Sequence, residues 1–333
     1  MILGEGARPR VSVLIVNYNY GRFLRDALES VRAQTFTDRE VVVADDGSTD
    51  NSRLVCEEFA DLAVRFVTGE HVGLSHNLQR GLSRCRGALV AFLSADDIWL
   101  SHHLASCVSA LDAHPPAAVA YSSCVTVDES GAPVRKSPTA RRPRSFPSGK
   151  IDPEELLPSQ FIATQAAVVK RDALLAIGGF DTSLHYTELD LFIRLITLYP
   201  IIYTNQTTVR YRQHHESLSR DHERALAARI ALYEKHLAHS PNVRRRLVAH
   251  AHSKTAYRQL KAATDRNAVA NARRNITRAI RLYPRTILRP LSVATLAAAM
   301  LGRFFLPVRV FYERRLADSR LKITLQKVLL MHR

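Results

Sequence analysis

Val11–Val16 (VSVLIV) is the stretch that decides the fold, because an almost continuous apolar run of this length predicts a strand buried on both faces. A polar loop, residues 17–21, follows it at once. The next segment, Arg22–Ala33, repeats apolar side chains at the spacing of a helix: Phe23, Ala27, Leu28 and Val31. A buried strand, a short loop and an amphipathic helix form the first unit of an α/β fold.

The same order of strand, loop and helix continues along the chain. Further strands are predicted over Glu40–Ala44, Val64–Val67 and Ala88–Leu93, and helices from about Asp50 to Phe59 and over Leu74–Cys85. Gly47, in the sequence DDGSTD after the second strand, favours the turn before the first of these helices. Strands and helices that alternate at this interval predict an α/β fold with a doubly wound, mostly parallel sheet.

Three of the predicted loops carry residues suited to a nucleotide. In such sheets, ligands bind beyond the carboxyl ends of the strands, and the loops after the first, second and fourth strands carry Tyr18, Asp46 and the pair Asp96-Asp97. The ring could stack on a base, one acid could accept base or ribose protons, and the pair could hold a divalent cation on a diphosphate. Taken alone, the acids after the second strand are as well explained by a helix-capping turn, and Tyr18 is better explained by packing.

The basic residues are concentrated in the last third of the 333-residue chain. Residues 220–333 carry 25 Lys and Arg against 6 Asp and Glu, a balance of +19, whereas residues 1–219 carry 22 against 25, a balance of −3. We therefore predict two regions with these bounds. Only the second favours an anionic surface, either lipid or nucleic acid.

The cysteines and the first residues bear on the compartment. The four cysteines form no Cys-x-x-Cys pair, which argues against a thiolate zinc site and fits a reducing environment. Residues 1–10 lack a long apolar run, so we expect no secretory signal. Both observations favour a cytoplasmic protein.

Several segments, taken in order, resemble those of family 2 glycosyltransferases. Ser12–Asn19 (SVLIVNYN), Ser30–Phe36 (SVRAQTF) and Asp45–Asp50 (DDGSTD) are similar to the opening of these enzymes. Ser94–Asp97 (SADD) resembles their Asp-x-Asp-type metal motif, with serine where many members carry the first aspartate. The resemblance covers about residues 10–219. It implies the GT-A fold and transfer of a sugar, with inversion, from a nucleotide-diphosphate donor.

The resemblance also implies roles for individual residues on the donor side. It places the Val16 backbone, Tyr18 and Asp46 at the base and ribose. Asp96 would approach the ribose or phosphates, and Asp97, together with Asp96, would ligate Mg²⁺ or Mn²⁺.

The segment His71–Asn77 matches the part of the family that lines the nucleotide side of the cleft. Within it, Gly73 and Asn77 match the lining positions. His76 falls where a basic residue often occurs, and its role stays open.

The catalytic base is expected near the start of a helix around residues 187–195. Leu191, Arg194 and Leu195 recur at helical spacing, which puts Glu188 in the first turn, where the helix dipole favours an acid in any case. The segment is similar to the family's Glu-Asp-x-Asp-Leu-x-x-Arg helix. Glu188 matches the base, with one methylene more than the usual aspartate, and Asp190 matches a structural acid and is the second choice for the base.

Val209–Ser219 resembles the Tyr-Arg-x-His-x-x-Ser-x-Ser stretch that often closes this domain. Arg212 and His214 would then assist the leaving-group phosphates. For His215, an exposed loop position is the better interpretation.

One segment points to the acceptor. Residues 126–160, rich in Pro, Ser, Arg and Gly, predict a flexible loop that acts as a lid or acceptor contact, or else a solvated insertion. Strand character resumes over Ile162–Lys170, before a short helix that ends at Gly178–Asp181.

The basic region predicts helices over about 221–238, 241–263 and 266–282. Leu291–Leu306 is its most apolar segment, but the uncharged run between Arg289 and Arg303 is 13 residues, shorter than a membrane span. We expect a helix in the membrane interface, on the inner face of the cytoplasmic membrane, or else a helix packed inside this region. The region lacks interleaved aromatic residues and nucleic-acid motifs, so we expect no nucleic-acid partner.

Together these features predict an inverting glycosyltransferase that moves a sugar, most commonly from UDP in this family, to a hydroxyl of a glycan or lipid-linked acceptor in surface polysaccharide synthesis. Alternatives are a catalytically degenerate relative and a nucleic-acid-binding protein that uses the basic region. A nucleotidylyltransferase would need a Gly-rich phosphate loop, and none follows Val16.

Overall fold

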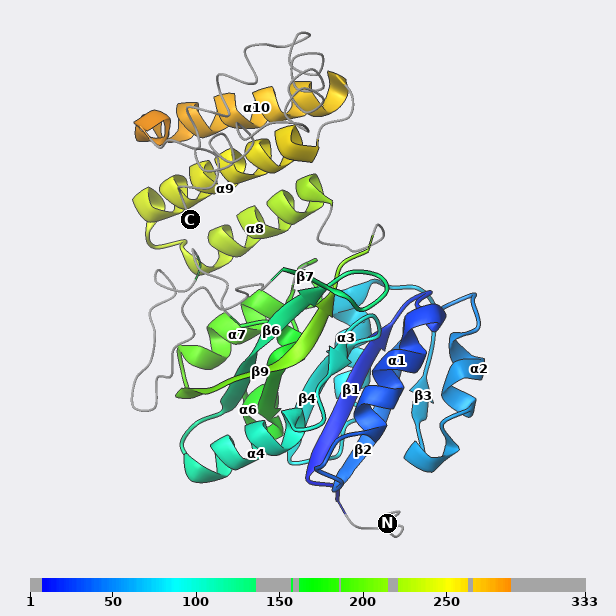
Figure 1. Ribbon diagram of the computed structural model, residues 1–333. Helices are drawn as coiled ribbons and strands as arrows, with labels where there is room; N and C mark the ends of the chain where they lie inside the picture. The colour runs from blue at the N-terminus through cyan, green and yellow to red at the C-terminus, as the bar shows by residue number, and fades with distance from the viewer. Residues whose placement is uncertain are drawn as a thin grey trace, which may run out of the picture. The chain divides into compact units, whose positions relative to one another are not determined.

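The computed structural model describes residues 8–135, 157, 162–185, 187–214, 221–262 and 266–288. The chain divides into two compact units, Met1–Arg220 and Asp221–Arg333. The described part of the first unit contains a nine-stranded sheet with helices packed on it, and the described part of the second contains helices and no strand (Figure 1).

The elements of the first unit follow the order expected for an α/β fold. Its strands are β1 (Val11–Asn17), β2 (Arg39–Asp45), β3 (Arg65–Val67), β4 (Leu89–Ser94), β5 (Ile98–Trp99), β6 (Val119–Val127), β7 (Pro133–Arg135), β8 (Ala167–Lys170) and β9 (Ile201–Arg212). Its helices are α1 (Gly21–Arg32), α2 (Ser52–Glu57), α3 (Leu74–Leu82), α4 (His103–Ala113), α6 (Arg171–Ala176) and α7 (Thr187–Ile196), with the 3₁₀ turns η1 (Ala60–Leu62) and η2 (Thr164–Ala166). Every strand and helix predicted over residues 11–94 is present, with its ends shifted by a few residues at most.

The sheet is mixed, with the strand order β3-β2-β1-β4-β8-β6-β9-β5 and β7 beside β6. The first four strands of this order pair in parallel, as predicted. β8 then pairs antiparallel with both β4 and β6, β9 pairs parallel with β6, and β5 pairs antiparallel with β9. The expectation of a mostly parallel sheet therefore holds for the amino-terminal half and not for the rest.

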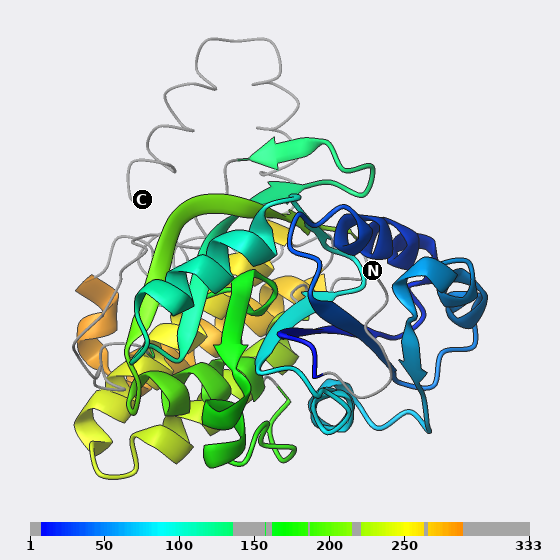
Figure 2. The same cartoon turned by 90° about the horizontal axis from the view of Figure 1, so that it is seen from below.

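β1 is buried on both faces because a helix covers each. Val13 and Ile15 belong to the same buried apolar cluster as Leu24 and Leu28 of α1. On the other face, Gly81 of α3 comes so close that a Cβ there would lie 2.4 Å from a methyl group of Leu14. Figure 2 shows α1 and α3 on opposite faces of the strands. This packing fixes the carboxyl ends of the parallel strands, where the predicted site residues lie.

The structure corrects the sequence interpretation of the middle of the chain. Residues 126–135, predicted as the start of a loop, include the end of β6 and the strand β7. Of the strand predicted over Ile162–Lys170, only Ala167–Lys170 is strand, since η2 occupies the residues before it. Most of the predicted loop over 126–160 lies outside the described residues.

The second unit contains α8 (His222–His236), α9 (Pro241–Ala262), α10 (Arg266–Leu282) and the 3₁₀ turn η4 (Pro284–Leu288). The helices agree with the three predicted from the sequence. Asp221 caps α8, its side chain accepting a hydrogen bond from the Arg224 amide (2.9 Å). The apolar segment Leu291–Leu306 lies outside the described residues. None of the described helices combines the length and apolar character needed to cross a membrane.

A buried histidine joins the strands at the far side of the sheet. His103, fully buried at the start of α4, places Nδ1 2.7 Å from the Thr208 hydroxyl of β9, which lies 2.6 Å from the Ser122 hydroxyl of β6. Burial lowers the pKa of His103 to about 3. The side chain is therefore neutral in the folded protein at ordinary pH.

This burial predicts a loss of stability in acid. As the pH falls below about 6.5, His103 takes up a proton in the unfolded chain, but in the folded protein only near pH 3. The free energy of unfolding should therefore decrease through this window. His103→Gln should be less stable than the wild type at pH 7 and should lose less stability between pH 6.5 and 4. Urea denaturation at several pH values measures both, and an unchanged pH slope in the variant would contradict the assignment.

Candidate functional site

The loops with the predicted site residues leave the sheet side by side. In the parallel register, Val16 of β1 lies between Ala44 of β2 and Ser94 of β4. The Ala95 amide donates to the Val16 carbonyl (3.0 Å), so this carbonyl is used within the sheet and its contact with a donor stays a prediction. The site residues that follow these positions are Tyr18, Asp46, Asp96 and Asp97.

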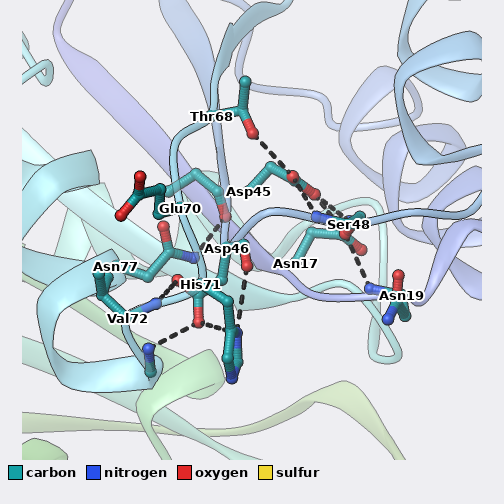
Figure 3. Close-up of polar contacts among 12 residues, drawn as sticks. Asn17, Asn19, Asp45, Asp46, Ser48, Thr68, Glu70, His71, Val72 and Asn77 are labelled. Atoms are coloured by element: carbon teal, nitrogen blue, oxygen red, sulfur yellow. Dashed lines mark hydrogen bonds and ion pairs between the residues drawn. The ribbon is translucent and has the colours of Figure 1, made fainter.

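Asp45 holds the ends of the first strands together and has a structural role. Its carboxylate accepts hydrogen bonds from the Asn17 amide group (2.7 Å), the Ser48 hydroxyl (2.6 Å) and amide (2.9 Å), and the Thr68 hydroxyl (3.0 Å), as Figure 3 shows. Burial alone would raise the pKa of Asp45, but these hydrogen bonds lower it below its ordinary value. Asp45 therefore stabilises the turn after β2, but it does not cap α2, whose N-cap residue is Asn51 without a side-chain capping bond.

Asp46 points away from Asp45 and fastens the loop between β3 and α3. One carboxylate oxygen, Oδ1, accepts from the Val72 amide (2.9 Å) and from Arg80 (3.3 Å). The other, Oδ2, accepts from the Gly73 amide (2.8 Å) and lies 2.9 Å from His71 Nδ1 (Figure 3). The side chain is 4% exposed. All four donors come from the loop between β3 and α3 and from α3 itself, so Asp46 attaches this segment to the end of β2.

Tyr18 is exposed and stacks on His71. The two ring centroids are 4.2 Å apart, with 24° between the planes. The Tyr18 ring is therefore available as a stacking platform, and packing in the core does not explain it. Tyr18 and Asp46, predicted from separate loops, both contact this one histidine.

The first turn of α3 completes this side of the site. Gly73 has φ of 89°, a conformation that favours glycine, and its amide donates to Asp46. Asn77 is buried and donates to the Ala44 carbonyl (2.8 Å), so it attaches α3 to β2. His76 is exposed.

Asp97 is a buried acid with one oxygen in use. Its Oδ1 accepts from the Arg212 amide (2.8 Å), while Oδ2 is buried with no hydrogen-bond partner among the described residues. Burial, reinforced by the neighbouring Asp96, raises the pKa of Asp97 well above its ordinary value, although Arg212 and the Gln165 side chain favour the charged form. A carboxylate in this position favours a cation beside it.

Asp96 is the more accessible acid of the pair and contacts a predicted site residue. Its Oδ2 lies 3.0 Å from His214 Nε2, and its side chain is 13% exposed. His214 is buried and packs against the rings of Tyr20 and Phe23. The structure therefore brings Asp96, Asp97, Arg212 and His214 together, from β4 and the end of β9.

The guanidinium of Arg212 is occupied by protein groups. It donates to Asp26 (2.6 Å) and to the Glu129 carbonyl (3.1 Å), and it lies over the Phe23 ring (4.7 Å to the centroid). Arg212 contacts the site through its amide, which binds Asp97. A contact between its side chain and donor phosphates stays a prediction.

The segment before α7 is attached to α3. The Ser75 hydroxyl donates to the Leu184 carbonyl, and the Gln79 side chain accepts from the Phe180 amide (2.9 Å). Phe180 also packs edge-on against Phe92 of β4. Because α3 begins beside Asp46, these contacts bring the start of α7 toward the same edge of the sheet.

The two candidate bases on α7 have different environments. Asp190 is fully buried, and its Oδ2 accepts from Arg194 Nε (2.7 Å). The remaining nitrogens of Arg194 donate to the carbonyls of Ile177 and Gly179 (2.7 Å each), so the pair anchors the turn before α7. Glu188, in the first turn, is half-buried, and burial raises the pKa of its carboxyl. The geometry favours a structural role for Asp190 and leaves Glu188 as the acid that can accept a proton.

His71 and Arg80 are contacts that the sequence analysis did not single out. In the sequence, the segment His71–Asn77 matches the nucleotide-lining part of the family, but Gly73 and Asn77 are its lining positions and His71 has no role there. Since β3 pairs in parallel with β2, its loop leaves the same edge of the sheet. Applying the strand-end rule to this strand as well would have pointed to His71.

The acids after β4 fit a hard divalent cation. Such ions bind carboxylate oxygens, and Mg²⁺ is usually held by one or two carboxylates together with substrate phosphates. Asp97 offers a buried oxygen that no described residue contacts by hydrogen bond, and Asp96 lies next to it. The described residues contain no group of three or more His, Cys, Asp or Glu arranged to hold a metal ion. Asp96 and Asp97 therefore suit a cation that a donor's phosphates would share.

The environments of Asp190 and Glu188 predict opposite effects on stability. Asp190→Asn should lower the free energy of unfolding by about 3–5 kcal/mol, because it removes one charge of a buried ion pair. Glu188→Gln should leave that free energy unchanged or raise it slightly, because a neutral side chain is easier to bury. Urea denaturation at pH 7 compares the two. Equal losses would show that Glu188 also has a structural role.

Comparison with known proteins identifies relatives over the same region. The family model Glycosyl transferase family 2 matches residues 12–178. The E. coli protein named UDP-Glc:alpha-D-GlcNAc-diphosphoundecaprenol beta-1,3-glucosyltransferase WfgD is 34% identical over 95 residues, which are 28% of this chain and 38% of that protein. The chain spans between 27% and 35% of the length of the first curated relatives it matches.

Solved structures share the fold. S. aureus TarS 1–349 in complex with UDP-GlcNAc is similar with a TM-score of 0.59 at 16% identity, covering 87% of this chain and 90% of that one. A mannosyltransferase from Pyrobaculum calidifontis in complex with GDP-Man and Mn²⁺ is similar with a TM-score of 0.55 at 20% identity, covering 98% and 89%. At these identities the likeness concerns the fold, which is the GT-A fold. The match to the family model extends over half of the sequence, and the chain belongs to glycosyltransferase family 2.

Proposed function

We propose that the protein is an inverting glycosyltransferase that transfers a sugar from a nucleoside-diphosphate donor to a hydroxyl of a glycan or lipid-linked acceptor. UDP is the first nucleotide to test, and surface polysaccharide synthesis is the proposed context. Membership of glycosyltransferase family 2 supports the reaction class. The similarity to WfgD, named as a glucosyltransferase on a diphosphoundecaprenol-linked sugar, supports the acceptor class.

The observation that carries the proposal is the gathering of an exposed aromatic ring and three acids at one edge of the sheet. Tyr18 and Asp46 lie within contact of the same residue, His71, and Asp96–Asp97 follow the adjacent strand β4. A nucleotide that extended from Tyr18 and Asp46 to the acid pair Asp96–Asp97 would place its base on the Tyr18 ring and its diphosphate near the pair. The sugar would then face the start of α7, which is attached to α3 beside this edge.

The proposed reaction is a single in-line displacement. An acceptor oxygen attacks the anomeric carbon from the face opposite the nucleotide, and the bond to the diphosphate oxygen breaks with its electron pair. Glu188 takes the proton of the acceptor hydroxyl. Its raised pKa makes the carboxylate a stronger base than an exposed glutamate. When bound, a divalent cation at Asp97 and Asp96 would stabilise the charge on the departing diphosphate.

The neighbours of the acid pair would keep it in position. His214 holds Asp96 by a hydrogen bond, and the Arg212 amide holds Asp97. We assign these two residues to the diphosphate side of the site. For Arg212 the role is to position Asp97, because Asp26 and Glu129 occupy its guanidinium.

The activity of three variants tests these roles. With Mn²⁺ or Mg²⁺ and a panel of nucleotide-sugars, release of the nucleoside diphosphate should fall at least about 100-fold in Glu188→Gln, the range expected for loss of a general base. Glu188→Asp should retain part of the activity, because it keeps the carboxylate. Asp97→Asn should lose both turnover and its dependence on the cation.

A matched control is His114→Ala, an exposed substitution at the end of α4. It should behave as the wild type. If Glu188→Gln kept full activity, the base would lie elsewhere. A wild-type protein without cation-dependent donor cleavage would favour the catalytically degenerate alternative.

We also propose that the second unit binds an anionic membrane surface, so that the protein lies on the inner face of the cytoplasmic membrane. α10 supports this proposal. Ala272, Ile276 and Ala279 lie on its buried face, and the charged side chains that it exposes are all basic. The exposed arginines of this face are Arg273, Arg274, Arg278 and Arg281.

Binding to vesicles tests the membrane proposal. The full chain should sediment with vesicles that contain anionic lipid and not with neutral vesicles, and salt should weaken the binding. Replacing the four exposed arginines of α10 by glutamine should weaken it at least about tenfold, since each basic residue near the surface contributes about 1 kcal/mol. Tighter binding to an oligonucleotide than to anionic vesicles would favour the nucleic-acid alternative.

A further inference from the structure

Asp46 has no accepting position left in this structure. A carboxylate offers about four lone-pair positions, two on each oxygen. The amide of Val72 and Arg80 contact Oδ1, while the amide of Gly73 and His71 Nδ1 contact Oδ2. An N–H group of a nucleobase can therefore bind Asp46 only if one of these donors leaves.

His71 is the donor that can leave most easily. Two of the others are backbone amides, and Arg80 is 22% exposed, whereas the side chain of His71 is 56% exposed. The backbone next to it is held by the Val72 and Gly73 amides, which donate to Asp46, and it packs closely against Gly47, where a Cβ would lie 3.0 Å from the His71 amide. A rotation of the His71 side chain alone would release Asp46 and leave the loop in place (Figure 3).

The same side chain covers one face of Tyr18. Its ring centroid is 4.2 Å from that of Tyr18, too close for another ring to lie between them. Nδ1 of His71 lies 2.9 Å from the Asp46 carboxylate and 3.2 Å from the Asp46 backbone carbonyl, and since both oxygens can only accept, Nδ1 carries the proton. The imidazole thus makes two contacts at once: an aromatic ring stacked on Tyr18 and a ring N–H donated to Asp46.

We propose that His71 is an internal substitute for the nucleobase, occupying the place of the donor's base until the donor displaces it. This inference rests on the proposed function. It gives His71 two effects: a lower affinity for the donor and a selection among nucleobases. A nucleobase displaces the imidazole only if its stacking on Tyr18 and its N–H donation to Asp46 are more favourable in free energy than those of the imidazole. The imidazole also keeps the buried Asp46 carboxylate fully hydrogen-bonded when no donor is present.

The consequence is a measurable gain in affinity when the substitute is removed. If His71 occupies the nucleobase position in about 70–90% of molecules, the apparent dissociation constant for the nucleotide is about three- to tenfold higher than the constant for a site without the imidazole. His71→Ala should then bind its nucleotide about three- to tenfold more tightly than the wild type. His71→Phe, which keeps the ring and lacks the N–H donor, should show a smaller gain.

Calorimetric titration of the full chain with UDP, GDP, CDP and dTDP in the presence of Mn²⁺ tests this expectation. The nucleotide that binds best is then compared with its nucleoside alone, followed by NMR, and with pyrophosphate alone. The gain in His71→Ala should appear for the nucleotide and for the nucleoside, and should be absent for pyrophosphate, because the contact concerns only the base. His114→Ala is the matched control, and thermal unfolding midpoints confirm that the variants are folded.

The outcomes separate the inference from the proposed function. If the wild type binds a nucleotide and His71→Ala binds it equally or more weakly, the substitute role is wrong, and a weaker binding would show that His71 contacts the bound base. If His71→Ala also bound pyrophosphate more tightly than the wild type, the substitute role would be wrong as well. If neither protein binds any of the four nucleotides, the proposed function itself fails, and the inference fails with it.

Discussion

The site depends on the buried hydrogen bonds of Asp45 at the end of β2. Four donors from three segments converge on its carboxylate: the Asn17 side chain at the end of β1, the hydroxyl and amide of Ser48 in the turn after β2, and the Thr68 hydroxyl after β3. A buried carboxylate is costly unless it is fully hydrogen-bonded, and here the hydrogen bonds keep its pKa low in spite of burial. Parallel strands alone would place the loops at one edge, and Asp45 fixes how they leave it.

Asp46 uses that fixed frame to order the next loop, and under the proposed function it binds the donor's base. Successive residues at the end of a strand point to opposite sides, so the residue after Asp45 faces the loop between β3 and α3. It orders that loop through two backbone amides, and the loop in turn presents His71 to Tyr18. Two adjacent aspartates therefore have separate roles: Asp45 joins the ends of the strands, and Asp46 orders the loop that carries His71. Exchanging their roles would require a different register of the whole strand.

The sequence predicted well which loops leave the sheet at one edge, because its signals are local. Apolar runs ending in Tyr18, Asp46 and Asp96–Asp97, together with parallel pairing, are enough to place these loops at one edge. The second half of the sheet was not predicted, since β8 and β9 join it through pairings between distant segments that no local pattern reveals. Contacts made by long side chains were missed for the same reason. Nothing in the sequence around Arg212 indicates that Asp26 would occupy its guanidinium.

The energetics of the acid pair explain why stability and donor binding should be coupled. Asp97 is buried beside another acid, and its raised pKa means that ionising it costs the folded protein free energy. The Arg212 amide offsets part of this cost, while the second oxygen remains without a hydrogen bond among the described residues. A fold that only needed stability would place an apolar residue there, as replacements of buried charges by apolar side chains often show. An acid in this position is useful if a cation and a diphosphate arrive together, because each lowers the cost of binding the other.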